Sequence, residues 1–186
     1  MKTKFVVRLV ALFCFAAAGL RAQDRSKVDI FAGYSYVQAN PSTSQLDSFH
    51  LNGGSISGAY NVNNWLGTVA DFGGYTNGNI GGNGVDGSLY TYLFGPRVSY
   101  RHSGRITPYG QVLFGVAHET ASGFGVAGSQ NAFAMTVGGG LDYRLTHRFS
   151  VRPFQVEYLL TRFPEVTAGN QTQNNLRVSA GFVVHF

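Results

Sequence analysis

The last stretch of the chain, residues 174–186, alternates between apolar and polar side chains with a period of two. One parity is apolar throughout, and the other is polar or very small except for Val183. Because successive side chains of a β-strand point to opposite faces, this stretch predicts a strand with one apolar face. A soluble sandwich would bury that face, whereas a transmembrane barrel would turn it toward lipid. The apolar members are Leu176, Val178, Ala180, Phe182, Val184 and Phe186.

The same alternation recurs along the chain and is interrupted by stretches rich in Gly, Asn and Ser. It predicts eight strands whose connections are alternately long and short, with no helix after residue 22. The expected strands are residues 28–37, 49–62, 65–76, 88–101, 106–118, 133–144, 148–162 and 174–186. The expected long loops are residues 38–48, 77–87, 119–131 and 163–173.

Two of the expected strands carry an irregularity. Gly53 and Gly54 interrupt the period of the second strand, which suggests a β-bulge. In the seventh strand the apolar parity changes between Val151 and Val156, and a bulge near Pro153 would reconcile the two halves. Such a bulge would keep the polar residues of that strand on one side of the sheet.

An even number of strands with alternating loop lengths is typical of outer-membrane barrels, in which short turns face the periplasm and long loops face outward. Closing the sheet also removes exposed strand edges. The sequence therefore predicts an all-β fold, an eight-stranded antiparallel up-and-down transmembrane β-barrel.

The first residues have the features of a secretory signal peptide. Basic residues precede an apolar run over 9–20, and Ala22 then supplies a small residue for cleavage. We therefore expect a signal peptide over 1–22 and the barrel over 23–186. The single Cys lies in the removed segment, so the mature chain would have no disulfide. Four of the 14 basic residues also lie there, which leaves 10 against 9 acidic residues, so nucleic acid is not an expected partner.

Several short motifs resemble a known family. The segments FAGYSY at 31–36, YLFGPR at 92–97, PYGQ at 108–111 and GGGLD at 138–142, together with the terminal Phe186, are similar to the outer-membrane β-barrel family typified by the transmembrane domain of outer-membrane protein A. The resemblance implies an outer-membrane location in contact with lipid. It also implies that the last strand, with Phe182, Val184 and Phe186, is an insertion signal for the barrel-assembly machinery. The chain stops at this strand, so a peptidoglycan-binding domain is not expected.

The parity opposite the apolar face carries the candidate site. Ionisable groups inside a small barrel are expected to pair with one another and to close the bore, because bare charges there would be costly. A structural network is therefore expected, with an ion gate or proton path as the alternative. An open porin would need about sixteen strands. The expected network is Asp29, Asp71, Arg97, Asp142, Arg152, Glu157 and Arg177, with Arg101 and Arg144 nearer the short turns.

Metal and nucleophile chemistry have weaker support. The five His residues are scattered without metal-ligand spacing, so no metal and no cofactor are expected. His147 with Ser150, or His50 with Ser48, are the pairs that a lipid A-modifying barrel enzyme could use. A rim position is the simpler interpretation of both histidines.

The sequence thus favours a non-enzymatic integral outer-membrane protein with a role in envelope integrity. The alternatives are the lipid A-modifying enzyme, a small gated channel or adhesin, and a secreted barrel that carries an apolar ligand. The expected outer loops hold acidic residues without Lys or Arg, whereas the expected short turns are basic. This asymmetry supports the orientation with the loops outside the cell.

Overall fold

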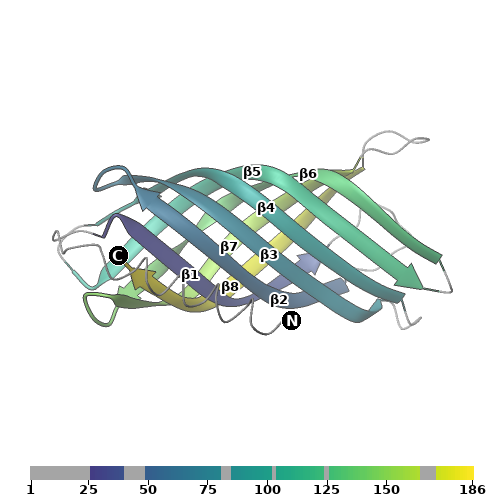
Figure 1. Ribbon diagram of the computed structural model, residues 1–186, viewed down its shortest axis with the longest axis horizontal. Helices are drawn as coiled ribbons and strands as arrows, with labels where there is room; N and C mark the ends of the chain where they lie inside the picture. The colour runs from purple at the N-terminus through teal and green to yellow at the C-terminus, as the bar shows by residue number, and fades with distance from the viewer. Residues whose placement is uncertain (1–25, 40–48, 81–84, 102–103, 124–125, 164–170) are drawn as a thin grey trace, which may run out of the picture.

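The computed structural model describes residues 26–39, 49–80, 85–101, 104–123, 126–163 and 171–186, and these residues form a closed barrel. Each strand pairs with its neighbours in sequence, every pair is antiparallel, and β1 closes the sheet against β8. The strands run at a marked tilt to the long axis of the barrel (Figure 1). The eight-stranded up-and-down barrel expected from the sequence is confirmed. The strands are β1 (Val28–Ala39), β2 (Phe49–Asn61), β3 (Leu66–Ile80), β4 (Val85–Ser99), β5 (Ile106–Gly123), β6 (Val126–Arg144), β7 (Phe149–Phe163) and β8 (Gln171–His185).

The main chain at the two ends of the barrel domain completes the closure. The backbone N–H of Lys27 donates to the carbonyl of Phe186 at 2.8 Å, and the N–H of Phe186 donates to the carbonyl of Val28 at 2.9 Å. The short connections after β2 and β6 lie at this same end, which is the periplasmic end in outer-membrane barrels. The expected signal peptide over 1–22 lies outside the described residues. Among the described residues, no helix is long and apolar enough to cross a membrane.

Two of the expected long loops are largely strand, so these predictions were wrong. β3 and β4 extend into 77–87, and β5 and β6 continue through most of 119–131. The register pairs Glu119 with Gln130 and Thr120 with Ser129. Backbone N–H and C=O groups form a ladder whatever the side chains are, so a hairpin can continue past its last apolar residue. The other two expected loops also begin or end in strands, at 38–39, 163 and 171–173, and the remaining parts, 40–48, 81–84, 124–125 and 164–170, lie outside the described residues.

The two expected bulges have opposite outcomes. The register between β7 and β8 shifts between Arg152 and Gln155, which confirms the bulge near Pro153. The bulge expected at Gly53 and Gly54 is wrong, because both residues stay in register with β1 and β3. A Cβ at Gly53 would lie 1.9 Å from the carbonyl oxygen of Gly74. Glycine at this position permits close approach of two strands rather than an extra residue.

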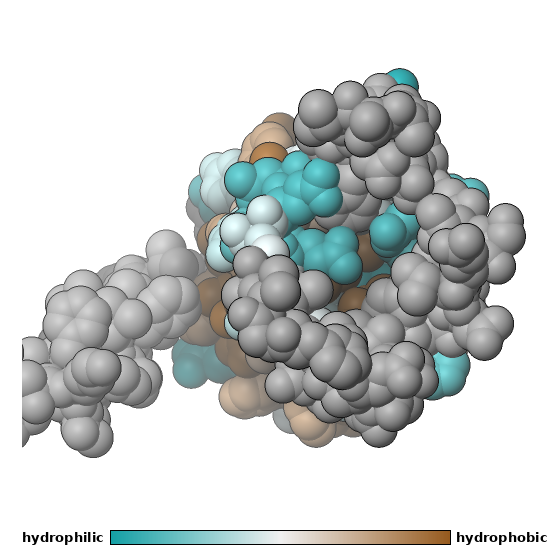
Figure 2. Space-filling model, turned by 90° about the vertical axis from the view of Figure 1, so that its right-hand side faces the viewer, coloured by the Kyte–Doolittle hydropathy of each residue, from teal (hydrophilic) through white to brown (hydrophobic). Residues whose placement is uncertain are grey.

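The barrel places apolar side chains outside and ionisable ones inside. Tyr92, Phe94 and Phe182 are 53%, 61% and 65% exposed, whereas Arg152 and Arg177 are completely buried. Figure 2 views the barrel from the end opposite Phe186 and shows hydrophilic residues around the opening and apolar residues on the flank. The lipid-facing and interior faces therefore follow the parity expected from the sequence.

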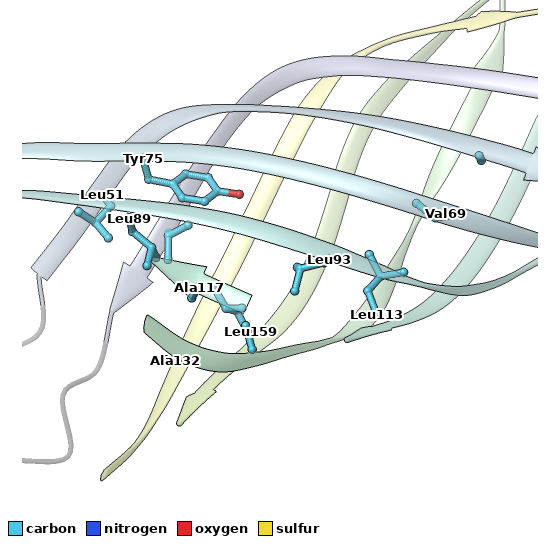
Figure 3. Packing of buried hydrophobic residues seen from close by; sticks show 12 residues of the cluster. Leu51, Val69, Tyr75, Leu89, Leu93, Leu113, Ala117, Ala132 and Leu159 are labelled. Atoms are coloured by element: carbon cyan, nitrogen blue, oxygen red, sulfur yellow. The ribbon is translucent and has the colours of Figure 1, made fainter. Parts of the chain in front are cut away.

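Apolar side chains also point into the barrel, where they form a buried cluster (Figure 3). Along β3, Asp71 is followed toward the outer end by Tyr75, and along β7, Glu157 is followed by Leu159. Most of the cluster therefore lies on the outer side of these acids, and only Ala59 and Val69 lie toward the periplasmic end. We call the larger group the apolar layer: Val37, Leu51, Tyr75, Leu89, Leu93, Leu113, Ala117, Ala132, Ala134 and Leu159.

Candidate functional site

The centre of the ionisable interior is Arg177 of β8, which reaches two acidic residues on other strands. Its Nε donates to Oε2 of Glu157 on β7 at 2.7 Å, and its Nη1 donates to Oδ1 of Asp71 on β3 at 2.7 Å. The same Nη1 lies 3.0 Å from the hydroxyl of Tyr75, the point at which this group meets the apolar layer. One guanidinium therefore links β8, β7 and β3 across the bore.

Two glutamines hold the Glu157 carboxylate in place. The Nε2 atom of Gln111 donates to its Oε1 at 2.7 Å, and the Nε2 atom of Gln155 donates to its Oε2 at 2.6 Å. Both glutamines are almost completely buried. With Arg177, these donors satisfy both oxygens of a carboxylate that is itself 1% exposed.

Arg152 forms a second centre nearer the periplasmic end. Its guanidinium makes a two-point contact with Asp142, with Nε to Oδ1 at 2.7 Å and Nη2 to Oδ2 at 3.0 Å. It also lies between two aromatic rings, 4.4 Å from the centroid of Phe31 and 4.5 Å from that of Tyr109. A planar guanidinium suits both contacts, because it forms parallel hydrogen bonds and stacks on rings.

Arg97 is the third interior arginine and is held differently. Its Nε donates to Oε1 of Gln111 at 2.9 Å, and its guanidinium lies 4.4 Å from the ring centroid of Tyr109. It forms no ion pair with any residue that the structure describes. The central group still contains three acids and three arginines. We call it the ionic layer: Asp71, Arg97, Asp142, Arg152, Glu157 and Arg177.

Asp29 lies apart from the ionic layer, at the periplasmic end. Its Oδ2 accepts from Arg101 at 2.7 Å and from Asn61 at 2.8 Å, and its Oδ1 contacts Ser26 and Nδ1 of His185, each at 2.7 Å. Arg101, which we expected near a short turn, joins this group, whereas Arg144 is exposed to solvent. The seven expected residues thus fall into two groups rather than one.

Asp29, His185 and Ser150 form a chain of contacts that joins β1, β8 and β7. The Nε2 atom of His185 lies 2.7 Å from the Ser150 hydroxyl. This order of groups is that of a nucleophile, a base and an orienting acid. Ser150, however, is only 2% exposed, and the neighbouring backbone N–H groups lie in the strand ladder. The chain of contacts therefore serves as a clasp between the first strand and the last two strands.

Of the two nucleophile pairs that a lipid A-modifying enzyme could use, the pair of His147 with Ser150 is not formed, and the pair of His50 with Ser48 is not tested. Ser150 contacts His185 instead of His147, which is exposed in the turn after β6. His50 is bonded through Nδ1 to the Tyr36 hydroxyl at 2.7 Å, and Ser48 lies outside the described residues. Within the described residues, no group of three His, Cys, Asp or Glu side chains could hold a metal ion.

Sequence reasoning missed several members of the interior. Gln111 and Gln155 bridge the charged groups, and Phe31, Tyr75 and Tyr109 pack against the arginines. Their signal was the parity, because each shares the interior face of its strand with the charged residues. Phe31 in particular is an apolar residue on the interior parity of its strand, and its ring lies under Arg152.

The insertion signal expected in the last strand lies at the periplasmic end of β8. Phe182 faces lipid, and Val184 and Phe186 are half-buried. The main chain of Phe186 takes part in closing the barrel, as described above. These three residues therefore form the end of the seam between β8 and β1.

Solved structures with similar folds are small outer-membrane barrels. Neisserial surface protein A aligns with a TM-score of 0.68 and 19% identity, over 88% of this chain and 100% of that protein. Ail, the attachment invasion locus protein of Yersinia pestis, aligns with a TM-score of 0.57 and 19% identity, over 86% and 99%. OprG of Pseudomonas aeruginosa aligns with a TM-score of 0.53 and 11% identity, over 89% and 99%. At such identities the likeness shows the fold.

The family of this protein is shown by its sequence rather than by its fold. No curated protein matches the chain. The family model for the outer membrane protein beta-barrel domain matches residues 7–186, nearly the whole sequence. The chain therefore belongs to the outer membrane protein beta-barrel family and is a protein of the outer membrane of Gram-negative cells.

Proposed function

We propose that this protein is a non-enzymatic structural barrel of the outer membrane that contributes to envelope integrity, and that its interior is closed to ions. The observation that carries the proposal is the ionic layer, in which Arg177 joins Glu157 and Asp71 from three different strands. These side chains are at most 1% exposed. A pore lined by water would leave such groups exposed.

The size of the barrel supports the same proposal. An eight-stranded barrel has an interior just wide enough for side chains to fill. Here the side chains of the ionic layer and of the apolar layer, together with buried polar side chains such as Thr91 and Thr161, pack the bore. An ion would have to displace paired charges and then cross apolar side chains, and both steps are costly.

Conductance in planar lipid bilayers tests the closed interior. The refolded protein is expected to give no large steady current. The double variant Arg152→Ala and Arg177→Ala is expected to conduct, because it empties the middle of the bore. The control double variant, Arg105→Ala with Arg148→Ala, removes the same charge from exposed positions and is expected to give no current. A large steady current from the unaltered protein would contradict the proposal.

A deletion strain tests the role in the envelope. Loss of the protein is expected to increase the sensitivity of cells to bile salts and to large antibiotics that the intact outer membrane excludes. Expression of the wild-type chain, or of the Arg105→Ala and Arg148→Ala variant, is expected to restore resistance. Unchanged permeability in the deletion strain would argue against a structural role.

The end of β8 is proposed to be the signal that the barrel-assembly machinery reads. Its support is the aromatic Phe186 and the exposed Phe182 on a strand that closes the barrel. Phe186→Ser is expected to reduce assembly in cells while leaving refolding in detergent intact. Phe149→Ser, an exposed aromatic residue at the same end, is the matched control. Equal assembly of both variants would count against the signal.

Attachment to surfaces is a second candidate, and the β5–β6 hairpin favours it. These strands contain 18 and 19 residues, whereas about ten suffice to cross a bilayer. Toward the tip, Ser129, Gln130 and Asn131 are exposed, uncharged and polar. Removing residues 120–129 is expected to reduce binding of cells to extracellular matrix without loss of the barrel. Undiminished binding would leave only the structural role.

A further inference from the structure

The lipid-facing wall of β1–β4 contains an apolar groove of about 440 Å³. Its floor includes Ala32, Gly54 and Gly74, and its walls include Phe72, Tyr90 and Tyr92. No charged residue lines it. The volume lies within the range of small-molecule sites, about 300–1,000 Å³, although the groove is open along one side.

Strand register places the two floor glycines next to each other. Gly54 of β2 pairs with Gly74 of β3, and both belong to the parity that faces lipid. On either side of them lie tyrosines, since Gly54 pairs with Tyr34 of β1 and Gly74 pairs with Tyr90 of β4. Two missing side chains between two large ones produce a depression that crosses the strands.

Crowding of the backbone does not account for Gly74 and is slight at Gly54. A Cβ at Gly74 would lie 3.4 Å from the ring of Tyr90, and one at Gly54 would lie 3.3 Å from the carbonyl oxygen of Gly33. By contrast, the Cβ of a residue at Gly53 would meet a backbone oxygen at 1.9 Å. The wall could therefore carry a larger residue at position 74, and the absence of a side chain there keeps the groove open.

Two aromatic side chains of the groove wall pack against each other. The rings of Phe72 and Tyr92 make an edge contact, with their centroids 5.9 Å apart and their planes at 78°. Toward the outer end of the barrel, the Tyr34 hydroxyl donates to Asn52 at 2.6 Å. Beyond the apolar groove, toward the outer end, thus lie uncharged hydrogen-bonding groups.

We propose that this groove is a binding site for one acyl chain of a membrane lipid. The groove is continuous with the apolar belt, which hydrocarbon covers in the outer membrane. A lipid chain already lies in an apolar medium, so binding gains only the packing against preformed walls. The site therefore favours lipid over a surrounding detergent by several-fold rather than by many orders of magnitude.

Quenching of tryptophan fluorescence by brominated lipid measures this preference. Trp65 is the only tryptophan of the chain, so Trp65→Phe gives a silent background. Tyr90→Trp then reports on the groove, and Tyr158→Trp on β7 reports on ordinary wall, because the two tyrosines are 45% and 46% exposed. In neutral detergent micelles, phosphatidylcholine with brominated chains is added stepwise. Half-maximal quenching at residue 90 is expected at a several-fold lower lipid fraction than at residue 158.

Two glycine variants test whether the difference between the quenching midpoints at residues 90 and 158 depends on the groove. Gly74→Leu places a side chain on the floor of the groove. In this variant, half-maximal quenching at residues 90 and 158 is expected at the same lipid fraction. Gly58→Leu is the matched control, because Gly58 faces lipid on β2 outside the groove and a Cβ there meets nothing within 4 Å. Each variant is first checked for heat-modifiable mobility, which reports a folded barrel.

Native mass spectrometry of the chain with its own tyrosines gives an independent measurement. One retained lipid is expected on the wild-type and Gly58→Leu proteins, and none on Gly74→Leu. Equal midpoints at residues 90 and 158, or equal lipid retention by all three proteins, would overturn the proposal. A lipid-free dimer that Gly74→Leu converts to monomer would also overturn it, because a second copy would then fill the groove.

Discussion

The ionic layer and the apolar layer fill the same bore by different physical means. In the ionic layer, long side chains reach across the barrel, and Arg177 alone contacts three partners. In the apolar layer, side chains such as Leu113 and Leu159 are fully buried without directional bonds. The first layer depends on particular partners, whereas the second depends on total volume.

This difference implies different consequences of damage. Removing one member of a buried ion pair leaves its partner charged and without compensation. Removing an apolar side chain leaves a cavity, and the surrounding residues relax into part of it. The two layers should therefore differ in how much stability one substitution removes, and in whether a second substitution can restore it.

The largest effect is expected from Arg177→Met. The variant leaves Glu157 and Asp71 buried without their cation, so the free energy of unfolding should fall by about 4 kcal/mol. Urea denaturation of the refolded protein in lipid vesicles measures this change. Arg148→Met, which removes an exposed charge, is the control and should change the free energy by less than about 0.5 kcal/mol.

Neutralising the acids tests whether the loss arises from uncompensated charge. Adding Glu157→Gln and Asp71→Asn to Arg177→Met removes the orphaned carboxylates, so part of the lost stability should return. If the triple variant were less stable than Arg177→Met alone, the loss in Arg177→Met would arise from lost packing rather than from uncompensated charge.

A substitution in the apolar layer is expected to lower the free energy of unfolding somewhat less than Arg177→Met does. Leu159→Ala removes a completely buried side chain, and the resulting cavity should lower the free energy of unfolding by about 3 kcal/mol. The same urea titration applies, with Leu145→Ala in an exposed turn as the control. Leu159→Met should recover most of the loss, because volume rather than a particular partner is needed here. A loss as large in Leu159→Met as in Leu159→Ala would contradict this picture.

The alternation of side chains was enough to predict the barrel and its two faces. Tyr92 and Phe94 on one parity, and Arg97 on the other, fall where the period of two puts them. Partners inside the bore could not be predicted in this way. The contact between Asp71 and Arg177 joins residues more than 100 positions apart, and it depends on how the closed sheet brings opposite strands together.

Composition was a poor guide where the chain leaves the membrane. Residues 119–123 and 126–131 have the small and polar side chains of a loop, yet their backbones continue the ladder between β5 and β6. Composition likewise gave no indication that the interior changes from charged to apolar along its length. Leu89 and Leu93 share a parity with Arg97, so the alternation alone places them inside but does not tell which layer they form.

An intermediate effect is expected where the ionic layer meets the wall. A Cβ at Gly138 would lie 2.2 Å from the carbonyl oxygen of Val156 and 2.7 Å from Cγ of Glu157. Gly138→Ala should therefore displace Glu157 and cost about 2 kcal/mol in the urea titration. Gly58→Ala, where the Cβ meets nothing within 4 Å, should be neutral or slightly stabilising. Equal stability of the two variants would show that the wall can yield without disturbing the ionic layer.

The smallest effect is expected at the periplasmic clasp, where the charge has several partners. His185→Ala removes the contacts to Asp29 and Ser150, but Asp29 keeps Arg101, Asn61 and Ser26. The free energy of unfolding should fall by only about 1 kcal/mol, the amount typical of a lost hydrogen bond. His147→Ala in the neighbouring turn should be neutral. A loss from His185→Ala as large as that from Arg177→Met would mean that Asp29 depends on one partner, as the ionic layer does, and that the redundancy of its contacts gives no protection.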